Sequence, residues 1–417
     1  MAHIAIWLIA ALTITGILLR PRGWSEAVWA CLGASLLILL RLLPAQQALS
    51  AVWKGADVYL FLTGMMLLAE LARREGLFDW LASHAVLAAK GSQIRLFTFI
   101  YAVGILVTAL LSNDATAVVL TPAVYAAVKK ARGAVLPYLF ICAFVANAAS
   151  FVLPISNPAN LVIFGRTMPR LLDWLRSFAL PSLISIAVTY FVLLLRSGYQ
   201  LKHRIEVQPE FPALPSSGRN VALGILATAI ALLAASAARK DLGLPTFVAA
   251  LLVLIMIAVS NRSLRSALQV LSRISWEVLP MVAGLFVIVQ ALDWAGAIEQ
   301  VRTVLLDIES WTPVAASFAA AFGTALACNI ANNLPVGLLT GSAIQSMHLD
   351  HSVRNALVIG IDLGPNLSAT GSLATLLWLL ALRREGQNVS PWKFLKVGLL
   401  VAPPALLLTA FASALSA

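Results

Sequence analysis

The chain has 417 residues, of which 60% are hydrophobic and only 11% are Asp, Glu, Lys or Arg, and its mean hydropathy is +0.91. Soluble domains contain about 25% charged residues, so this composition excludes a soluble globular enzyme, and its low polarity excludes a disordered chain. The formal charge of +11 does not indicate nucleic-acid binding, because the basic residues lie in short gaps between apolar runs. At roughly 20 residues per crossing, the length predicts a polytopic membrane protein with about ten to twelve spans.

Apolar runs follow one another along the whole chain. The first, at 3–19, has no basic segment before it and is followed by Arg20 and Arg22, so it is predicted to be a span and not a cleaved signal peptide. The later runs are predicted at 24–43, 57–72, 94–111, 117–128, 135–153, 160–165, 178–195, 220–237, 244–260, 276–293, 312–327, 335–346, 353–363, 370–382 and 394–415. Several of these are too short to cross a bilayer alone.

Four polar clusters interrupt the apolar runs. They are SND at 112–114, ISNPAN at 155–160, CNIANN at 328–333 and GPNLSATGS at 364–372. Non-helical backbone at membrane depth is tolerated only where it is buried in protein or lines a wet cavity. The clusters are therefore predicted to be hairpin tips and helix breaks, and they are the expected location of the functional site.

The order of these motifs occurs twice. Three blocks align between the halves: 57–81 with 277–301, 113–124 with 332–343, and 156–160 with 365–369. In these alignments Gly64 falls opposite Gly284, and Asp114 falls opposite Asn333. Although the identities are few, the shared order of the blocks indicates an internal two-fold repeat.

The predicted fold is all-α, with two inverted five-span repeats that each contain a re-entrant hairpin and a broken span. An odd number of crossings per copy makes the copies inverted, and together they give about ten spans and two hairpins. The predicted boundaries are repeat 1 at 1–196, with hairpin 94–131 and broken span 135–165; a cytoplasmic linker at 197–219; and repeat 2 at 220–417, with hairpin 312–346 and broken span 353–383.

The distribution of basic residues predicts the orientation. The two-repeat arrangement places more than twice as many of the 29 Lys and Arg residues on one side of the membrane as on the other. The positive-inside rule makes that side cytoplasmic, so both termini are expected to face outward. A twelve-span arrangement, in which both hairpins cross fully, is the alternative topology.

Amides and hydroxyls dominate the four clusters. Amide side chains both donate and accept hydrogen bonds, and helix ends at the breaks add unpaired N–H and C=O groups, which together suit a small neutral polyhydroxyl solute. The alternative is that these side chains only cap the broken helices. The predicted binding residues are Ser112, Asn113, Asn157, Asn160, Asn329, Asn332, Asn333, Asn366, Ser368 and Thr370.

Two acidic residues belong to the clusters or border them. A carboxylate near the bilayer midplane is costly unless it is hydrated, paired or protonated. We therefore predict that Asp114 carries a coupled proton, with a permanently ionised helix cap as the alternative. Asp362, just before the GPN break, is expected to share the proton or to orient Asn366.

The sequence resembles a known transporter family at these motifs. LLSNDATAVVLTPAV, CNIANNLPVGLLTGS and DLGPNLSATGSLATLLWLLALRREG are similar to the ArsB family of arsenite and antimonite efflux permeases, within the ion transporter superfamily. The resemblance implies a bacterial inner-membrane carrier with elevator-like motion that exports trivalent arsenic and antimony hydroxides. It also implies operation on the proton gradient alone or together with a soluble arsenite-stimulated ATPase.

The remaining expectations concern cofactors and partners. Cys328 borders the second tip and is a candidate arsenic ligand, although nothing in the sequence places Cys31 or Cys142 near it. No phosphate-binding G-x-x-x-x-G-K-[ST] motif occurs, so ATP use would require a partner. The expected partners are arsenite or antimonite, protons and membrane lipid, with no cofactor and no nucleic acid.

Other functions remain open on the sequence. A sodium- or proton-coupled carrier of carboxylates or inorganic anions, from the same superfamily, is the main alternative. A carboxylate at a hairpin tip is a poor neighbour for a dianion, which favours a neutral or cationic substrate. An intramembrane enzyme is not expected, because the catalytic motifs H-E-x-x-H and G-x-S-x-G do not occur.

Overall fold

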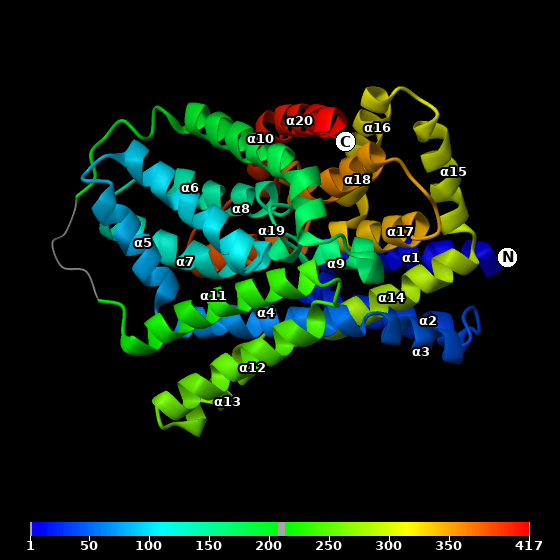
Figure 1. Ribbon diagram of the computed structural model, residues 1–417, viewed down its shortest axis with the longest axis horizontal. Coiled ribbons are helices and arrows are strands. Elements are labelled where there is room, and N and C mark those ends of the chain that lie inside the picture. Colours follow the sequence, from blue (N-terminus) through cyan, green and yellow to red (C-terminus); the bar gives the residue numbers. More distant parts are fainter. Residues whose placement is uncertain (1, 207–212, 417) are drawn as a thin grey trace.

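The computed structural model describes residues 2–206 and 213–416, so part of the predicted linker, 207–212, lies outside the described residues. Within the described residues the chain is helical, and the only strand-like contact is a single bridge between Ser92 and Arg204. Most helices run along the long axis of the molecule (Figure 1). The predicted all-α fold is confirmed.

The first half contains ten α-helices. They are α1 (Ala2–Leu19), α2 (Glu26–Leu39), α3 (Ala45–Lys54), α4 (Ala56–Arg74), α5 (Leu77–Ala88), α6 (Gln93–Leu110), α7 (Thr121–Lys130), α8 (Val135–Ala148), α9 (Pro158–Phe164) and α10 (Leu171–Ser197). A π-helical turn, η2 (Ala115–Leu120), precedes α7, and short 3₁₀ turns flank α9.

The second half contains ten more in the same order. They are α11 (Ser216–Ala237), α12 (Gly243–Ser260), α13 (Leu264–Arg273), α14 (Val278–Trp294), α15 (Ala297–Glu309), α16 (Pro313–Ala331), α17 (Asn333–Ile344), α18 (His351–Leu363), α19 (Leu373–Arg384) and α20 (Pro391–Ser416). Helices at matching places have similar lengths, for example 10 residues in both α3 and α13.

The packing of the helices repeats between the two halves, as their order does. Helix α4 packs along α12 while its counterpart α14 packs along α2, and α10 packs along its own counterpart α20. Gly64 of α4 approaches the backbone of Thr246 so closely that a Cβ would lie 2.8 Å from its carbonyl carbon, and Gly284 of α14 stands at the same 2.8 Å from Ala30. The two glycines that the sequence aligned therefore make matching helix contacts.

The number of unbroken spans is smaller than ten. Among the described residues, eight helices are long and apolar enough to cross a membrane, or nine when the α3–α4 pair, bent by 47°, counts as one span. Two of the eight, α6 and α16, belong to the segments predicted as hairpins. The difference arises because α2 has only 14 residues and because polar breaks divide α8 from α9 and α18 from α19.

The two hairpin tips turn by different means. After α6, the chain continues through Ser112 to Asp114 into η2, where Pro122 cannot donate to the carbonyl of Val118, and such a missing bond favours a widened turn. Between α16 and α17, the turn depends on Asn332, whose φ of 71° is rare for a residue with a side chain.

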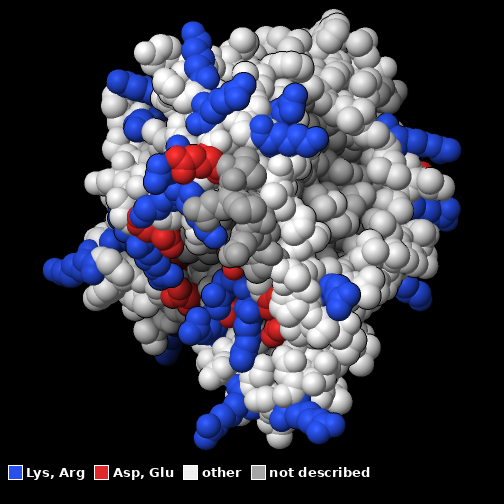
Figure 2. All heavy atoms as spheres, turned by 90° about the vertical axis from the view of Figure 1, so that its left-hand side faces the viewer, with Lys and Arg blue, Asp and Glu red and all other residues white. Residues whose placement is uncertain are grey.

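Basic side chains gather at one end of the molecule. Figure 2 views the left-hand end of Figure 1 and shows Lys and Arg spread over it. Helices α4, α7, α10, α13 and α19 carry Lys or Arg in their last turn, where a cation complements the helix dipole. The positive-inside rule predicts that this end is cytoplasmic.

Candidate functional site

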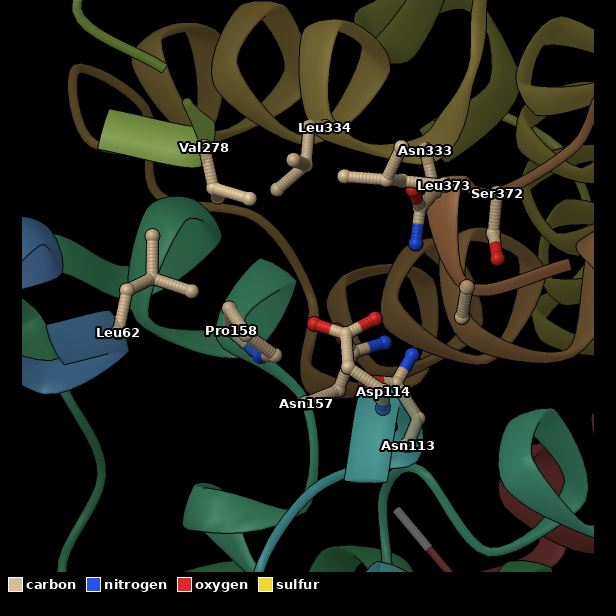
Figure 3. Close-up of a pocket in the computed structure, with 11 residues that line it drawn as sticks. Leu62, Asn113, Asp114, Asn157, Pro158, Val278, Asn333, Leu334, Ser372 and Leu373 are labelled. Carbon is tan, nitrogen blue, oxygen red and sulfur yellow. Dashed lines mark hydrogen bonds between the residues drawn. The ribbon is translucent and has the colours of Figure 1, made fainter. Parts of the chain in front are cut away.

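A small cavity lies where all four polar breaks meet. It leaves about 20 Å³ for the centre of a water-sized molecule, which is room for one or two waters. Helices α4 and α14 contribute Leu62 and Val278, which face the breaks across the cavity (Figure 3). The residues from the breaks are Asn113, Asp114, Asn157, Pro158, Asn333, Leu334, Ser372, Leu373 and Ala374.

Four helices begin at this cavity. Asp114 stands directly before η2, Asn333 is the first residue of α17, and Asn157 and Ser372 are the N-caps of α9 and α19. The caps are made by side chains: Asn157 Oδ1 accepts from the N–H of Ala159, and Ser372 Oγ accepts from the N–H of Thr375. Helix N-termini carry partial positive charge, so this arrangement favours oxygen atoms with free lone pairs.

The polar side chains that line the cavity are three amides, one carboxyl and the hydroxyl of Ser372. Asn113, Asn157 and Asn333 are 2%, 2% and 4% exposed, and they surround the half-buried Asp114 (Figure 3). Within the described chain, the side chains of Asn333 and Asp114 make no hydrogen bond, so both are free to contact a solute. None of the residues that line the cavity is Lys or Arg.

Two hydrogen bonds cross between the halves behind the cavity. Asn157 Nδ2 donates to Asp362 Oδ1 at 2.7 Å, and Asn147 Nδ2 donates to Asn366 Oδ1 at 3.0 Å. Asn147 and Asp362 each stand one residue before the end of α8 and α18, so the bonds are related by the repeat. The structure therefore links Asp362 to Asn157, whereas the sequence suggested that it orients Asn366.

Three of the predicted binding residues of the second half, Asn329, Ser368 and Thr370, form a separate network. Asn329 Nδ2 donates to the carbonyls of Ala325 and Gly364 at 2.7 and 2.9 Å, and its Oδ1 accepts from Ser368 Oγ at 2.5 Å. Thr370 Oγ1 donates to the carbonyl of Asn329 at 3.0 Å. This network joins hairpin α16–α17 to the break before α19, and its members do not line the cavity.

Four other predicted residues are also held by the protein itself. Asn332 accepts from the N–H of Leu334 and donates to the carbonyl of Thr370, both at 3.4 Å. Ser112 Oγ accepts from the N–H of Ala115, and Asn160 Nδ2 donates to the carbonyl of Ser150. Asn366 is fully buried, where its Nδ2 donates to the carbonyl of Phe144. Of the residues predicted for the site, the cavity is therefore lined by Asn113, Asp114, Asn157 and Asn333.

Cys328 lies apart from the cavity. It is fully buried in α16, with its Sγ 3.8 Å from the carbonyl of Ile361. In the described part of the chain, no three His, Cys, Asp or Glu side chains are grouped to hold a metal ion.

Three residues of the site region gave no signal that the sequence analysis used. Leu62 and Val278 are ordinary apolar residues, and only their place opposite the breaks sets them apart. Asn147 is a fully buried amide within the apolar run 135–153, and that unusual position is the signal that could have identified it.

Comparison with known proteins agrees with this architecture. An arsenical pump membrane protein of Escherichia coli is 29% identical over 98% of this chain and 97% of its own length, and a putative arsenical pump membrane protein of Bacillus subtilis is 25% identical over 95% and 96%. These full-length matches confirm the resemblance to arsenite permeases. The YdaH transporter of Alcanivorax borkumensis shares the fold, with a TM-score of 0.57 over 93% of this chain and 97% of that chain at 14% identity.

The family model named CitMHS, described as a citrate transporter, matches residues 6–382. With its full-length transporter relatives and its eight or more apolar helices, the chain is a multi-pass bacterial membrane transporter and not an enzyme. Because the model covers most of its length, the chain belongs to the CitMHS family of transporters.

Proposed function

We propose that the protein exports arsenite and antimonite, as their neutral trihydroxides, across the bacterial inner membrane in exchange for protons. The observation that carries the proposal is the cavity in which three buried amides surround one carboxyl, with no Lys or Arg among the lining residues. A neutral trihydroxide has lone pairs for the amides and O–H groups for the carboxyl. The names of the full-length relatives support an arsenical substrate.

Asp114 is proposed to carry the coupled proton, with Asp362 as a second acidic group behind it. Asp114 reaches the cavity, while Asp362 is fully buried and is bonded to Asn157, which also lines the cavity. Asp362 Oδ2 has no hydrogen-bond partner within the described chain, and a buried charge left in this way is costly unless a proton neutralises it. Arsenite would bind when Asp114 is ionised and would leave when Asp114 takes up a proton.

The proton gradient is sufficient for this task. One proton moving down 100 mV supplies about 2.3 kcal/mol, and each tenfold gradient of a neutral solute costs about 1.4 kcal/mol. One proton per arsenite therefore supports roughly a fifty-fold gradient, so a soluble ATPase would be an additional partner and not a requirement.

The transport movement is proposed to be elevator-like. The helix pairs α4–α12 and α14–α2 form one group, while the hairpins, the broken spans and the α10–α20 pair form the other. The cavity lies between the groups, and the first group contributes only the apolar Leu62 and Val278 to it. A polar, solute-holding group can slide past such an apolar wall without breaking hydrogen bonds.

Arsenite uptake into everted membrane vesicles tests the proposal. Vesicles energised by respiration, with no ATP or ATPase present, are expected to accumulate arsenite, and a protonophore is expected to abolish the accumulation. Uptake that requires sodium, or that does not respond to the proton gradient, would contradict the proposal.

The second candidate is a sodium- or proton-coupled carrier of carboxylates or inorganic anions. The description of the matching family as citrate transporters favours it, as do the helix N-termini at the cavity. It predicts that citrate is taken up or competes with arsenite in the same vesicles. The acidic Asp114 and the lack of lining Lys or Arg make the cavity less suited to a polyanion.

A further inference from the structure

Two of the three amides at the cavity, those of Asn113 and Asn157, already use their oxygens within the protein and are left to donate to a solute. Asn113 Oδ1 already accepts from the N–H of Asp114 at 2.9 Å. Asn157 Oδ1 accepts from the N–H of Ala159 at 3.0 Å, and one of its Nδ2 hydrogens goes to Asp362. The remaining N–H groups of Asn113 and Asn157 need an acceptor, whereas an ionised Asp114 carboxylate needs a donor.

We propose that Asp114 is the specificity-determining residue that admits solutes with O–H groups and rejects anions whose oxygens can only accept. The inference rests on the proposed function and deepens it, because it defines the substrate class as small neutral polyhydroxides. Without Asp114, the starts of α17 and α19 and the amide N–H groups would favour an anion. The carboxylate offsets that charge and repels acceptor-only oxygens at close range.

The second half of the chain supplies a natural comparison. Asn333 occupies the tip position that corresponds to Asp114, is 4% exposed, lines the same cavity and has no side-chain hydrogen bond within the described residues. A hairpin tip of this kind therefore accommodates an amide at that position. Asp114→Asn would make the two tips alike and would remove the only charge on the cavity wall.

Chlorate is a suitable probe. Like arsenious acid it is pyramidal, with a lone pair on the central atom and three oxygens, but it is an anion without any O–H group and is inert at neutral pH. Binding of chlorate and of arsenite is measured separately by calorimetry on the purified full chain. The variants are Asp114→Asn and, as a second removal of the charge, Asp114→Thr, with Asn333→Asp as the matched control.

Asp114→Asn and Asp114→Thr are expected to bind chlorate at least tenfold more tightly than the wild-type chain, and Asn333→Asp no more tightly than the wild-type chain. Equal chlorate affinity in the wild-type chain and in both folded Asp114 variants would overturn the inference. Failure of the wild-type chain to bind arsenite would instead refute the proposed function, because the inference is judged on the chlorate ratio alone.

Discussion

Asp114 and Asn333 stand at matching places in the two hairpin tips, and only the first can exchange a proton. In Asp114→Asn, arsenite is expected to equilibrate across the membrane, but the roughly fifty-fold accumulation at 100 mV should fall to about one, because the variant lacks the proposed proton carrier. Accumulation ratios in everted vesicles measure this. Retained uphill transport with an unchanged pH dependence would show that Asp114 does not carry the coupled proton.

Asn329 and Asn333 are four residues apart but differ in their bonds. Asn329→Ala removes three side-chain hydrogen bonds, so we expect it to lower the free energy of unfolding by about 2 kcal/mol or more.

Asn333→Ala removes no side-chain hydrogen bond within the described chain, so its expected loss of stability is below about 1 kcal/mol, together with a weaker affinity for arsenite. Unfolding in detergent and calorimetric titration separate these two effects. The reverse ranking in stability would mean that Asn333 holds the tip and that Asn329 does not.

Which asparagines face the cavity could not be predicted from the sequence. Amides that cap helices, amides that cross between the halves and amides that contact the cavity are chemically identical in the four clusters. What separates Asn366 from Asn157 is a partner more than 200 residues away, Asn147 for one and Asp362 for the other. Such pairings depend on how the two halves pack against each other, and the neighbouring sequence does not indicate them.

At the scale of helices, the close contacts of α4 with α12 and of α14 with α2 depend on two glycines. Gly64→Ala and Gly284→Ala would each place a Cβ 2.8 Å from a facing backbone carbonyl carbon, so each is expected to lower the free energy of unfolding by about 1–3 kcal/mol.

Gly323→Ala is the matched control for these contacts. This glycine lies inside α16 with nothing near its added Cβ, so the change is expected to be neutral or to stabilise the helix by up to about 1 kcal/mol. Thermal unfolding of the three variants gives the comparison. Equal stability of all three would mean that the facing helices move apart without cost.

The positions of the helix breaks were predictable, because polar clusters inside apolar runs have few alternatives in a membrane. The alignment of 156–160 with 365–369 pairs Asn157 with Asn366, which make the matching crossing bonds, but it did not predict which residue caps the following helix. Asn157 both bonds to the other half and caps α9, whereas Asn366 makes the crossing bond and Ser372 makes the cap of α19. A longer break in the second half separates these roles.

At the scale of the whole molecule, the basic side chains at the end shown in Figure 2 predict the orientation in the membrane. Lys130 is exposed at the end of α7, and Ser310 is exposed in the loop between α15 and α16. In a Cys31→Ser background, a membrane-impermeant maleimide is expected to label the Ser310→Cys variant in intact cells and the Lys130→Cys variant only in everted vesicles. Labelling of Lys130→Cys in intact cells would reverse the predicted topology.

The crossing bonds behind the cavity have a consequence for how the protein is made. Asn147 and Asn157 leave the ribosome 219 and 205 residues before the groups they bond, which at cellular rates of synthesis is roughly 10 to 40 seconds. During that delay the amides of Asn147 and Asn157 in the first half lack these partners from the second half. A chain truncated after the first half should therefore be degraded by membrane proteases. Co-expression of the second half from a separate mRNA should protect the truncated chain from this degradation.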